Sequence, residues 1–154
     1  MTVVELRHEN VTTTKTWQIK GRPVPYAVAI GAIRVLKKGG AQHAQYQVVL
    51  STNSRIWRCW KRFSDFKLLA EYARLSGLQH SIVAWTEVQS KQRLFRCLEE
   101  AYLRSKCLVL ERFMAQLLFE LPSPSLLLTF VQAPIEDTLG GGGAAGLGGR
   151  SRAA

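Results

Sequence analysis

The sequence has few cysteines and no long apolar run. Its three cysteines, Cys59, Cys97 and Cys107, are odd in number and lack the spacing of metal ligands. Free thiols in a reducing, cytosolic compartment are therefore expected. The N-terminus is polar and charged, unlike a secretory signal. No stretch approaches the roughly 20 apolar residues of a membrane-spanning helix. These absences predict a cytoplasmic chain that does not cross a membrane.

Signatures of catalysis are also absent. The sequence contains no P-loop pattern, no HExxH and no CxxC pair, and its three histidines, His8, His43 and His80, fall in no recognised catalytic motif. The pair Ser64-Asp65 is better explained as a helix cap than as a nucleophile with its orienting acid. We therefore expect no enzymatic activity, no cofactor and no metal site.

Positive charge is the main compositional feature. The 154 residues include 21 lysines and arginines against 11 acids, a formal net charge of +10. With 47% hydrophobic residues, the chain is long and apolar enough to bury one ordinary core. The charge favours an anionic partner, either phosphates on a membrane surface or a nucleic acid, and does not choose between them.

Residue patterns predict an α+β domain over residues 25–133. Alternating apolar residues, broken by short turns, predict a three-stranded antiparallel meander over Tyr26–Leu36, Tyr46–Ser51 and Arg55–Phe63. A bundle of three to four helices follows. The first helix contains Phe66 and Ala73 on one face, begins at a Ser64 or Asp65 cap and ends at Gly77.

Later helices are predicted from the same spacing rules. After a loop over Leu78–Glu87, helices are expected over Ser90–Arg104, Leu108–Phe119 and Ser125–Phe130. Residues 1–24 have little apolar periodicity and are expected to form a flexible arm with at most a short strand at Thr16–Lys20. Residues 134–154, rich in glycine and alanine, cannot bury enough surface and are expected to be disordered.

One stretch, Trp57-Arg58-Cys59-Trp60-Lys61-Arg62-Phe63-Ser64-Asp65-Phe66, carries a family resemblance. It resembles the signature of the Phox-homology (PX) domain, in which a strand of the form Trp-x-Val-x-Arg-Arg-Tyr/Phe-Ser-Asp-Phe leads into the first helix. Here Cys59 replaces the valine and Lys61 the first arginine, without a gap. The resemblance extends over roughly Pro25 to Val131. PX domains are phosphoinositide-binding modules built from strands followed by helices.

The resemblance implies a phosphoinositide site. The arginine in the place of Arg62 contacts the 3-phosphate of phosphatidylinositol 3-phosphate, the aromatic in the place of Phe63 packs against the inositol ring, and Lys61 lies beside them. A further family contact is an arginine on the second helix, for which Arg93 and Arg96 are both candidates. A guanidinium fork suits a phosphate and an aromatic wall suits a sugar face.

The segment after the first helix departs from the family pattern. PX domains usually carry Pro-Pro-x-x-Lys there, but Leu78–Gln89 contains neither proline nor lysine. Ile82, Val83 and Trp85 lie where family members often insert apolar residues into the membrane, and tryptophan suits that interface. Trp85 could equally close the core beneath a shortened loop.

Three functions remain in view. The leading one is a peripheral membrane module that recognises phosphatidylinositol 3-phosphate on endosomal membranes, with the headgroup and the anionic surface as partners. The alternative is a PX-fold protein-interaction module with weak or lost lipid binding. A nucleic-acid binder that stacks bases on Trp57 and Trp60 ranks third, because no nucleic-acid motif accompanies those residues.

Overall fold

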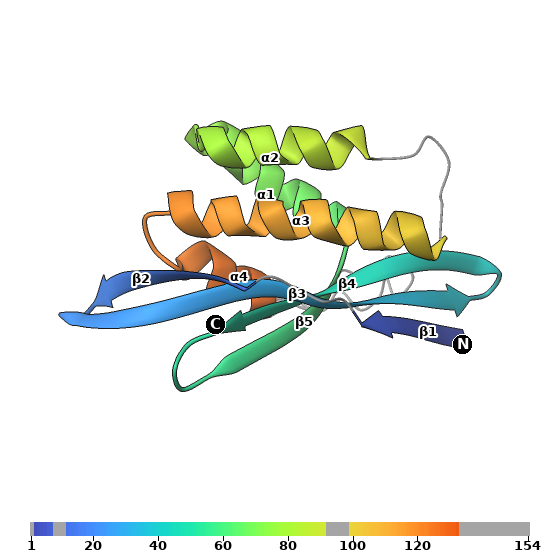
Figure 1. The fold of residues 1–154 in the computed structure, drawn as a ribbon, viewed down its shortest axis with the longest axis horizontal. Helices are drawn as coiled ribbons and strands as arrows, with labels where there is room; N and C mark the ends of the chain where they lie inside the picture. The colour runs from blue at the N-terminus through green and yellow to red at the C-terminus, as the bar shows by residue number, and fades with distance from the viewer. Residues whose placement is uncertain (1, 8–11, 92–98, 133–154) are drawn as a thin grey trace, which may run out of the picture.

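The computed structural model describes residues 2–7, 12–91 and 99–132. Within these ranges the chain forms an α+β fold in which an antiparallel sheet is followed by four helices (Figure 1). The strands are β1 (Thr2–Arg7), β2 (Thr13–Ile19), β3 (Arg22–Lys38), β4 (Ala41–Ser51) and β5 (Ile56–Arg62). The helices are α1 (Phe63–Ser76), α2 (Gln79–Ser90), α3 (Glu100–Glu120) and α4 (Ser125–Gln132).

The predicted meander is confirmed as β3, β4 and β5, and the sheet has two more strands. The 17-residue β3 is long enough for β1 and β2 to pair with successive halves of one edge, while β4 pairs with the other edge. The expectation of a flexible arm over residues 1–24 is therefore wrong for β1 and β2. Backbone pairing with β3 forms these two strands, and such pairing leaves little trace in apolar periodicity.

The long strand β3 changes its pairing at Gly31. The register with β4 shifts between Ile30 and Ala32, and the freed Ile30 N–H donates a hydrogen bond of 2.9 Å to the Glu111 carboxylate on α3. A Cβ at Gly31 would lie 3.0 Å from the Gln47 Oε1 atom and 3.1 Å from a Val49 methyl, so a glycine suits this bulge. Glu111 is buried and joins the irregular point of the sheet to the helix above it.

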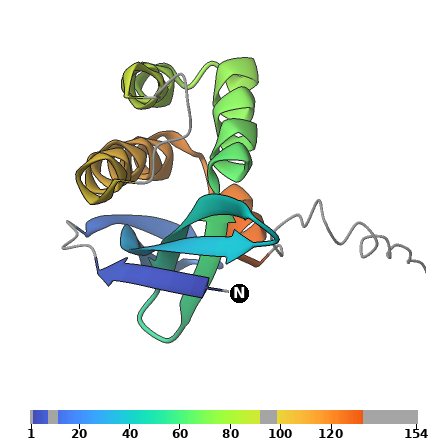
Figure 2. The ribbon, with the colours of Figure 1, turned by 90° about the vertical axis from the view of Figure 1, so that its right-hand side faces the viewer.

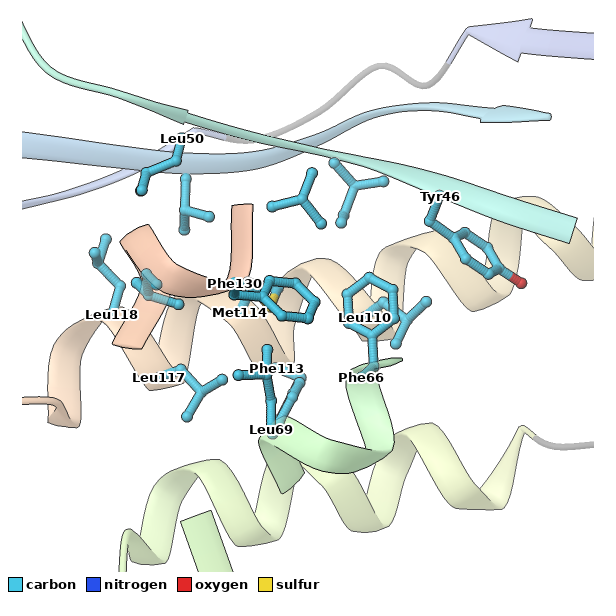
Figure 3. Packing of buried hydrophobic residues seen from close by; sticks show 14 of the residues in the cluster. Tyr46, Leu50, Phe66, Leu69, Leu110, Phe113, Met114, Leu117, Leu118 and Phe130 are labelled. Atoms are coloured by element: carbon cyan, nitrogen blue, oxygen red, sulfur yellow. The ribbon is translucent and has the colours of Figure 1, made fainter. Parts of the chain in front are cut away.

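All four helices lie on one side of the sheet (Figures 1 and 2). Helix α3 packs on β3, α2 packs on α3, and α4 packs against β4 and β5. Between the layers, Tyr46 and Leu50 of the sheet face apolar side chains of α3 and α4 (Figure 3). Each fully buried side chain of this kind contributes about 1.5–3 kcal/mol. The opposite side of the sheet, on which no described helix lies, is called the open face below.

Two helix predictions need correction. Leu78–Glu87, expected to be a loop, lies almost wholly in α2, because Ile82, Trp85 and Val88 recur at helical spacing and the last two pack toward the core. Ser90 ends α2 rather than beginning a new helix, and α3 is one helix that contains the predicted Leu108–Phe119. The predicted C-terminal end of α1 at Gly77 and the predicted start of α4 at Ser125 are confirmed. No described helix is long and apolar enough to cross a membrane.

Candidate functional site at the junction of β5 and α1

Strand β5 ends at Arg62 and helix α1 begins at Phe63 without an intervening loop. Arg62 has extended backbone angles, and its N–H donates a hydrogen bond of 2.8 Å to the Asp65 Oδ2 atom. The Asp65 carboxylate lies in the first helical turn, where the helix dipole favours negative charge. The capping residue of the sequence prediction is therefore corrected: Asp65 reaches back to Arg62 from inside the helix, and Ser64 does not begin it.

Phe63 points toward the helices. Its ring stacks on Trp85 of α2, with 5.5 Å between ring centres and 21° between planes. The Lys106 Nζ atom of α3 lies 3.8 Å from the centre of the same ring. Phe63 is thus held by two neighbours from two helices, and any inositol ring would have to share its surface with them.

Lys106 is a buried cation beside the junction. Its Nζ atom donates to the Tyr102 hydroxyl at 3.2 Å, and burial lowers the pKa of the amine to about 8. Contact with the Phe63 ring offsets part of the desolvation, because an aromatic face attracts a cation. Sequence reasoning missed this residue, although a lysine between the apolar residues Leu103 and Leu110 on one helix face was a visible signal.

Trp85 belongs to the packed helices. It is partly buried between Phe63 and Phe113, whose ring centre lies 5.0 Å away. Ile82 is also partly buried, whereas Val83 is 69% exposed. The predicted membrane-insertion loop of Ile82, Val83 and Trp85 is therefore corrected to a helix whose tryptophan faces inward.

Arg62 lies on the other side of the junction, on the open face. It is directly opposite Gln45 of β4, and Gln45 is directly opposite Arg34 of β3. Directly opposed residues share a sheet face, and residues two apart along a strand do as well, which places Trp60 there too. Within residues 2–7, 12–91 and 99–132, the Arg62 guanidinium donates no hydrogen bond and forms no ion pair.

Arg34, Gln45 and Trp60 form a connected group next to Arg62. The Arg34 Nε atom donates to the Gln45 Oε1 atom at 2.7 Å, and the guanidinium lies 4.3 Å from the centre of the Trp60 ring. Gln45 is only 4% exposed. Arg34 has no recognisable signal in the sequence, because an arginine between Ile33 and Val35 follows ordinary strand alternation.

The remaining predicted site residues do not join this group. Lys61 faces the helices, is 2% exposed, and places its Nζ atom 4.6 Å from the centre of the Phe130 ring. It lies on the opposite face from Arg62, so its expected place beside the phosphate contact is corrected. Arg93 and Arg96 lie outside the described residues.

A separate groove of about 270 Å³ lies between α2 and α3, where Arg112 and Glu87 form an ion pair of 3.1 Å. Both charged side chains at that groove are therefore already paired.

No group of three or more His, Cys, Asp or Glu in the described part of the chain could hold a metal ion.

No protein-family model, curated protein or solved structure matches the chain.

Proposed function

We propose that the chain is a PX-like module that binds phosphoinositide headgroups on anionic membrane surfaces, with Arg62 as the main phosphate contact. The observation that carries this proposal is the placement of the Arg62 guanidinium. Arg62 lies at the start of helix α1, where Asp65 accepts a hydrogen bond from its backbone N–H. Its guanidinium has no hydrogen bond or ion pair among the described residues. A phosphate at that place would meet both a guanidinium and the positive end of the α1 dipole.

Two further features support a membrane-bound anion. The net charge of +10 attracts the chain to anionic lipid surfaces over several ångströms. The order of a strand meander followed by helices, with the Trp57–Phe66 segment spanning the junction of β5 and α1, is the order expected of a PX-like fold. Phosphatidylinositol 3-phosphate and endosomal membranes remain the proposed ligand and location, because the signature resembles that group of PX domains.

In this proposal Phe63 has a positioning role. Its ring is fixed by Trp85 and by the Lys106 amine, so the first turn of α1 is held against α2 and α3. A rigid first turn keeps the neighbouring Arg62 at a defined position, which reduces the ordering cost of binding. The aromatic residue of the signature then acts mainly through the fold rather than as a free wall for the sugar.

Vesicle sedimentation tests the proposal. Phosphatidylcholine vesicles with and without phosphatidylinositol 3-phosphate are compared for the parent chain, Arg62→Ala and Arg55→Ala. Arg55 is an exposed arginine in the β4–β5 turn and controls for the loss of one positive charge. We expect Arg62→Ala to lose at least about tenfold in binding and Arg55→Ala to stay close to the parent. Equal losses in both variants, or no loss for Arg62→Ala, would contradict the proposal.

A second candidate is a protein-interaction module, favoured by an apolar stripe on α1. Leu68, Tyr72 and Leu75 recur at helical spacing and are all exposed. Exposed apolar patches often mark protein contacts. The second function replaces the first if the folded parent chain binds no phosphoinositide vesicle but binds a protein. The double variant Leu68→Gln/Leu75→Gln should then no longer bind that protein.

A further inference from the structure

Four directly opposed residues form a row across the open face. Glu5 of β1 is opposite Arg34 of β3, Arg34 is opposite Gln45 of β4, and Gln45 is opposite Arg62 of β5. Each step between directly opposed residues spans about 4.5–5.5 Å between Cα atoms. Arg34 and Arg62 are therefore about 10 Å apart at the backbone, with one neutral amide side chain between them, and two arginine side chains can converge across that distance.

Arg34 is held in place before any ligand arrives. Its Nε atom is fixed by Gln45 and its planar group lies on Trp60, and the Gln45 amide nitrogen is 3.3 Å from the His43 Nε2 atom. These contacts use the Nε–H of Arg34, and no described residue accepts a hydrogen bond from its terminal nitrogens. A fork that is already oriented loses little freedom when it binds an anion.

The surroundings of this row favour an anion. The five strands carry nine lysines and arginines, of which Lys15 and Lys61 face the helices, but one acidic residue, Glu5. Arg58 is exposed and lies two residues before Trp60, hence on the same face. Glu5 lies beside Arg34 at the far end of the row, away from Arg62, and the two form no ion pair. No described helix covers the open face (Figures 1 and 2).

We infer that Arg34 is a second phosphate contact, so that a phosphoinositide headgroup binds on the open face between the guanidinium groups of Arg34 and Arg62. The inference rests on the proposed function and assigns a site residue that the family signature does not include. A headgroup with two phosphates offers one anion to each guanidinium, and each guanidinium can bind a phosphate through two parallel hydrogen bonds. The buried Gln45 side chain stays bonded to Arg34 and holds that guanidinium in place beneath the ligand.

The same geometry disfavours single-stranded nucleic acid as the ligand. Such ligands bind through bases stacked on free aromatic rings along a basic groove. On the open face the strands contribute one aromatic residue, Trp60, and the Arg34 guanidinium already lies on its ring. A compact anion between two arginines fits this arrangement better than a chain of bases.

The test uses Arg34→Met, which keeps an apolar side chain over Trp60 and removes the guanidinium, and Arg34→Lys, which keeps the charge and removes the fork. Arg62→Met makes the same change at the other arginine of the row. Arg58→Met makes it at an exposed arginine outside the row and is the control. Binding is measured with phosphatidylcholine vesicles carrying phosphatidylinositol 3-phosphate, with vesicles carrying phosphatidylserine at the same surface charge, and with a water-soluble short-chain phosphatidylinositol 3-phosphate. Circular dichroism and melting confirm that each variant is folded.

We expect Arg34→Met and Arg62→Met each to weaken phosphatidylinositol 3-phosphate binding at least about tenfold, for vesicles and for the short-chain lipid, while Arg58→Met changes it less than about threefold. Arg34→Lys should lose about fivefold or more, which keeps the test decisive if the methionine variant fails to fold. If binding falls for Arg62→Met but not for Arg34→Met, the inference is overturned and the proposed function stands. If binding is unchanged in Arg34→Met and in Arg62→Met, the inference and the proposed function are both overturned. Tighter binding to a single-stranded oligonucleotide than to the vesicles, lost in Arg34→Met, replaces the headgroup by nucleic acid.

Discussion

The Lys106 Nζ atom lies 3.8 Å from the centre of the Phe63 ring, so a buried cation of α3 touches the first residue of α1. The contact links the helix layer to the junction that also carries Arg62. It has a cost, because burial lowers the pKa of Lys106 from 10.5 to about 8. The stability of the folded chain should therefore depend on pH.

Lys106 should make the folded chain more stable as the pH rises from about 8 to 10.5. Below pH 8 the amine is protonated in both states, and folding bears the full cost of burying the charge. Between pH 8 and 10.5 the folded chain has released this proton while the unfolded chain retains it, so the free energy of unfolding increases with pH. The whole effect amounts to about 3 kcal/mol.

A comparison with Lys106→Met isolates this effect. Burial raises the pKa of Cys107 and of Tyr46, which lowers stability at high pH, but both groups are present in both chains and cancel in the difference. Urea unfolding at pH 7 and at pH 10 should show the parent chain gaining about 2–3 kcal/mol on the methionine variant. A difference that is the same at both pH values would show that Lys106 is not desolvated in the folded chain.

Glu111 should stabilise the folded chain by accepting the Ile30 N–H at the bulge in β3. Glu111→Ala removes the carboxylate that accepts the Ile30 N–H and leaves that buried donor without this partner, so we expect a loss of about 1–3 kcal/mol in the free energy of unfolding, plus the loss of packing. Glu111→Gln keeps an acceptor oxygen and should cost less. Urea unfolding at neutral pH measures both, and equal losses in the two variants would contradict a role as hydrogen-bond acceptor.

The sequence predicted the elements whose signals are local. Gly77 ends α1 with a positive φ of 69°, and the backbone N–H groups of Gly77 and Leu78 donate to the carbonyls of Arg74 and Ala73, as at other glycine caps. Ser125 begins α4 after two prolines, as expected. The β5 strand and its direct entry into a helix also follow from residues adjacent in the chain.

The rest depended on pairings that the sequence does not display. The segments β1 and β2 are strands because β3 is long enough to pair with both, and that pairing depends on tertiary structure. Helix α2 was missed because the family resemblance places a loop there, although Ile82, Trp85 and Val88 had helical spacing. Arg34 is brought beside Arg62 only by strand register, since it lies 28 positions earlier in the sequence.

Asp65 should fix the junction more strongly than Ser64 does. Asp65→Ala removes the acceptor of the Arg62 N–H, and we expect a loss of about 0.5–2 kcal/mol in the free energy of unfolding, as for other capping residues. Since Arg62 is then less fixed, binding to phosphatidylinositol 3-phosphate vesicles should also weaken. Ser64→Ala, at an exposed neighbouring position, is the control and should change neither. A larger effect for Ser64→Ala would assign the cap to the serine.

Trp85 should be a stability residue rather than a membrane anchor. Its ring packs against Phe63 and Phe113, so Trp85→Ala removes two aromatic contacts and leaves a space between three elements; we expect a loss of about 3 kcal/mol in the free energy of unfolding. Trp85→Phe should retain most of the stacking and lose less. Val83→Ala, at an exposed position on the same helix, should change stability by less than about 0.5 kcal/mol. Because the ring faces inward, vesicle binding per folded molecule should be the same in Trp85→Phe and in the parent. A phenylalanine variant that melts like the parent but sediments poorly with vesicles would return Trp85 to the membrane surface.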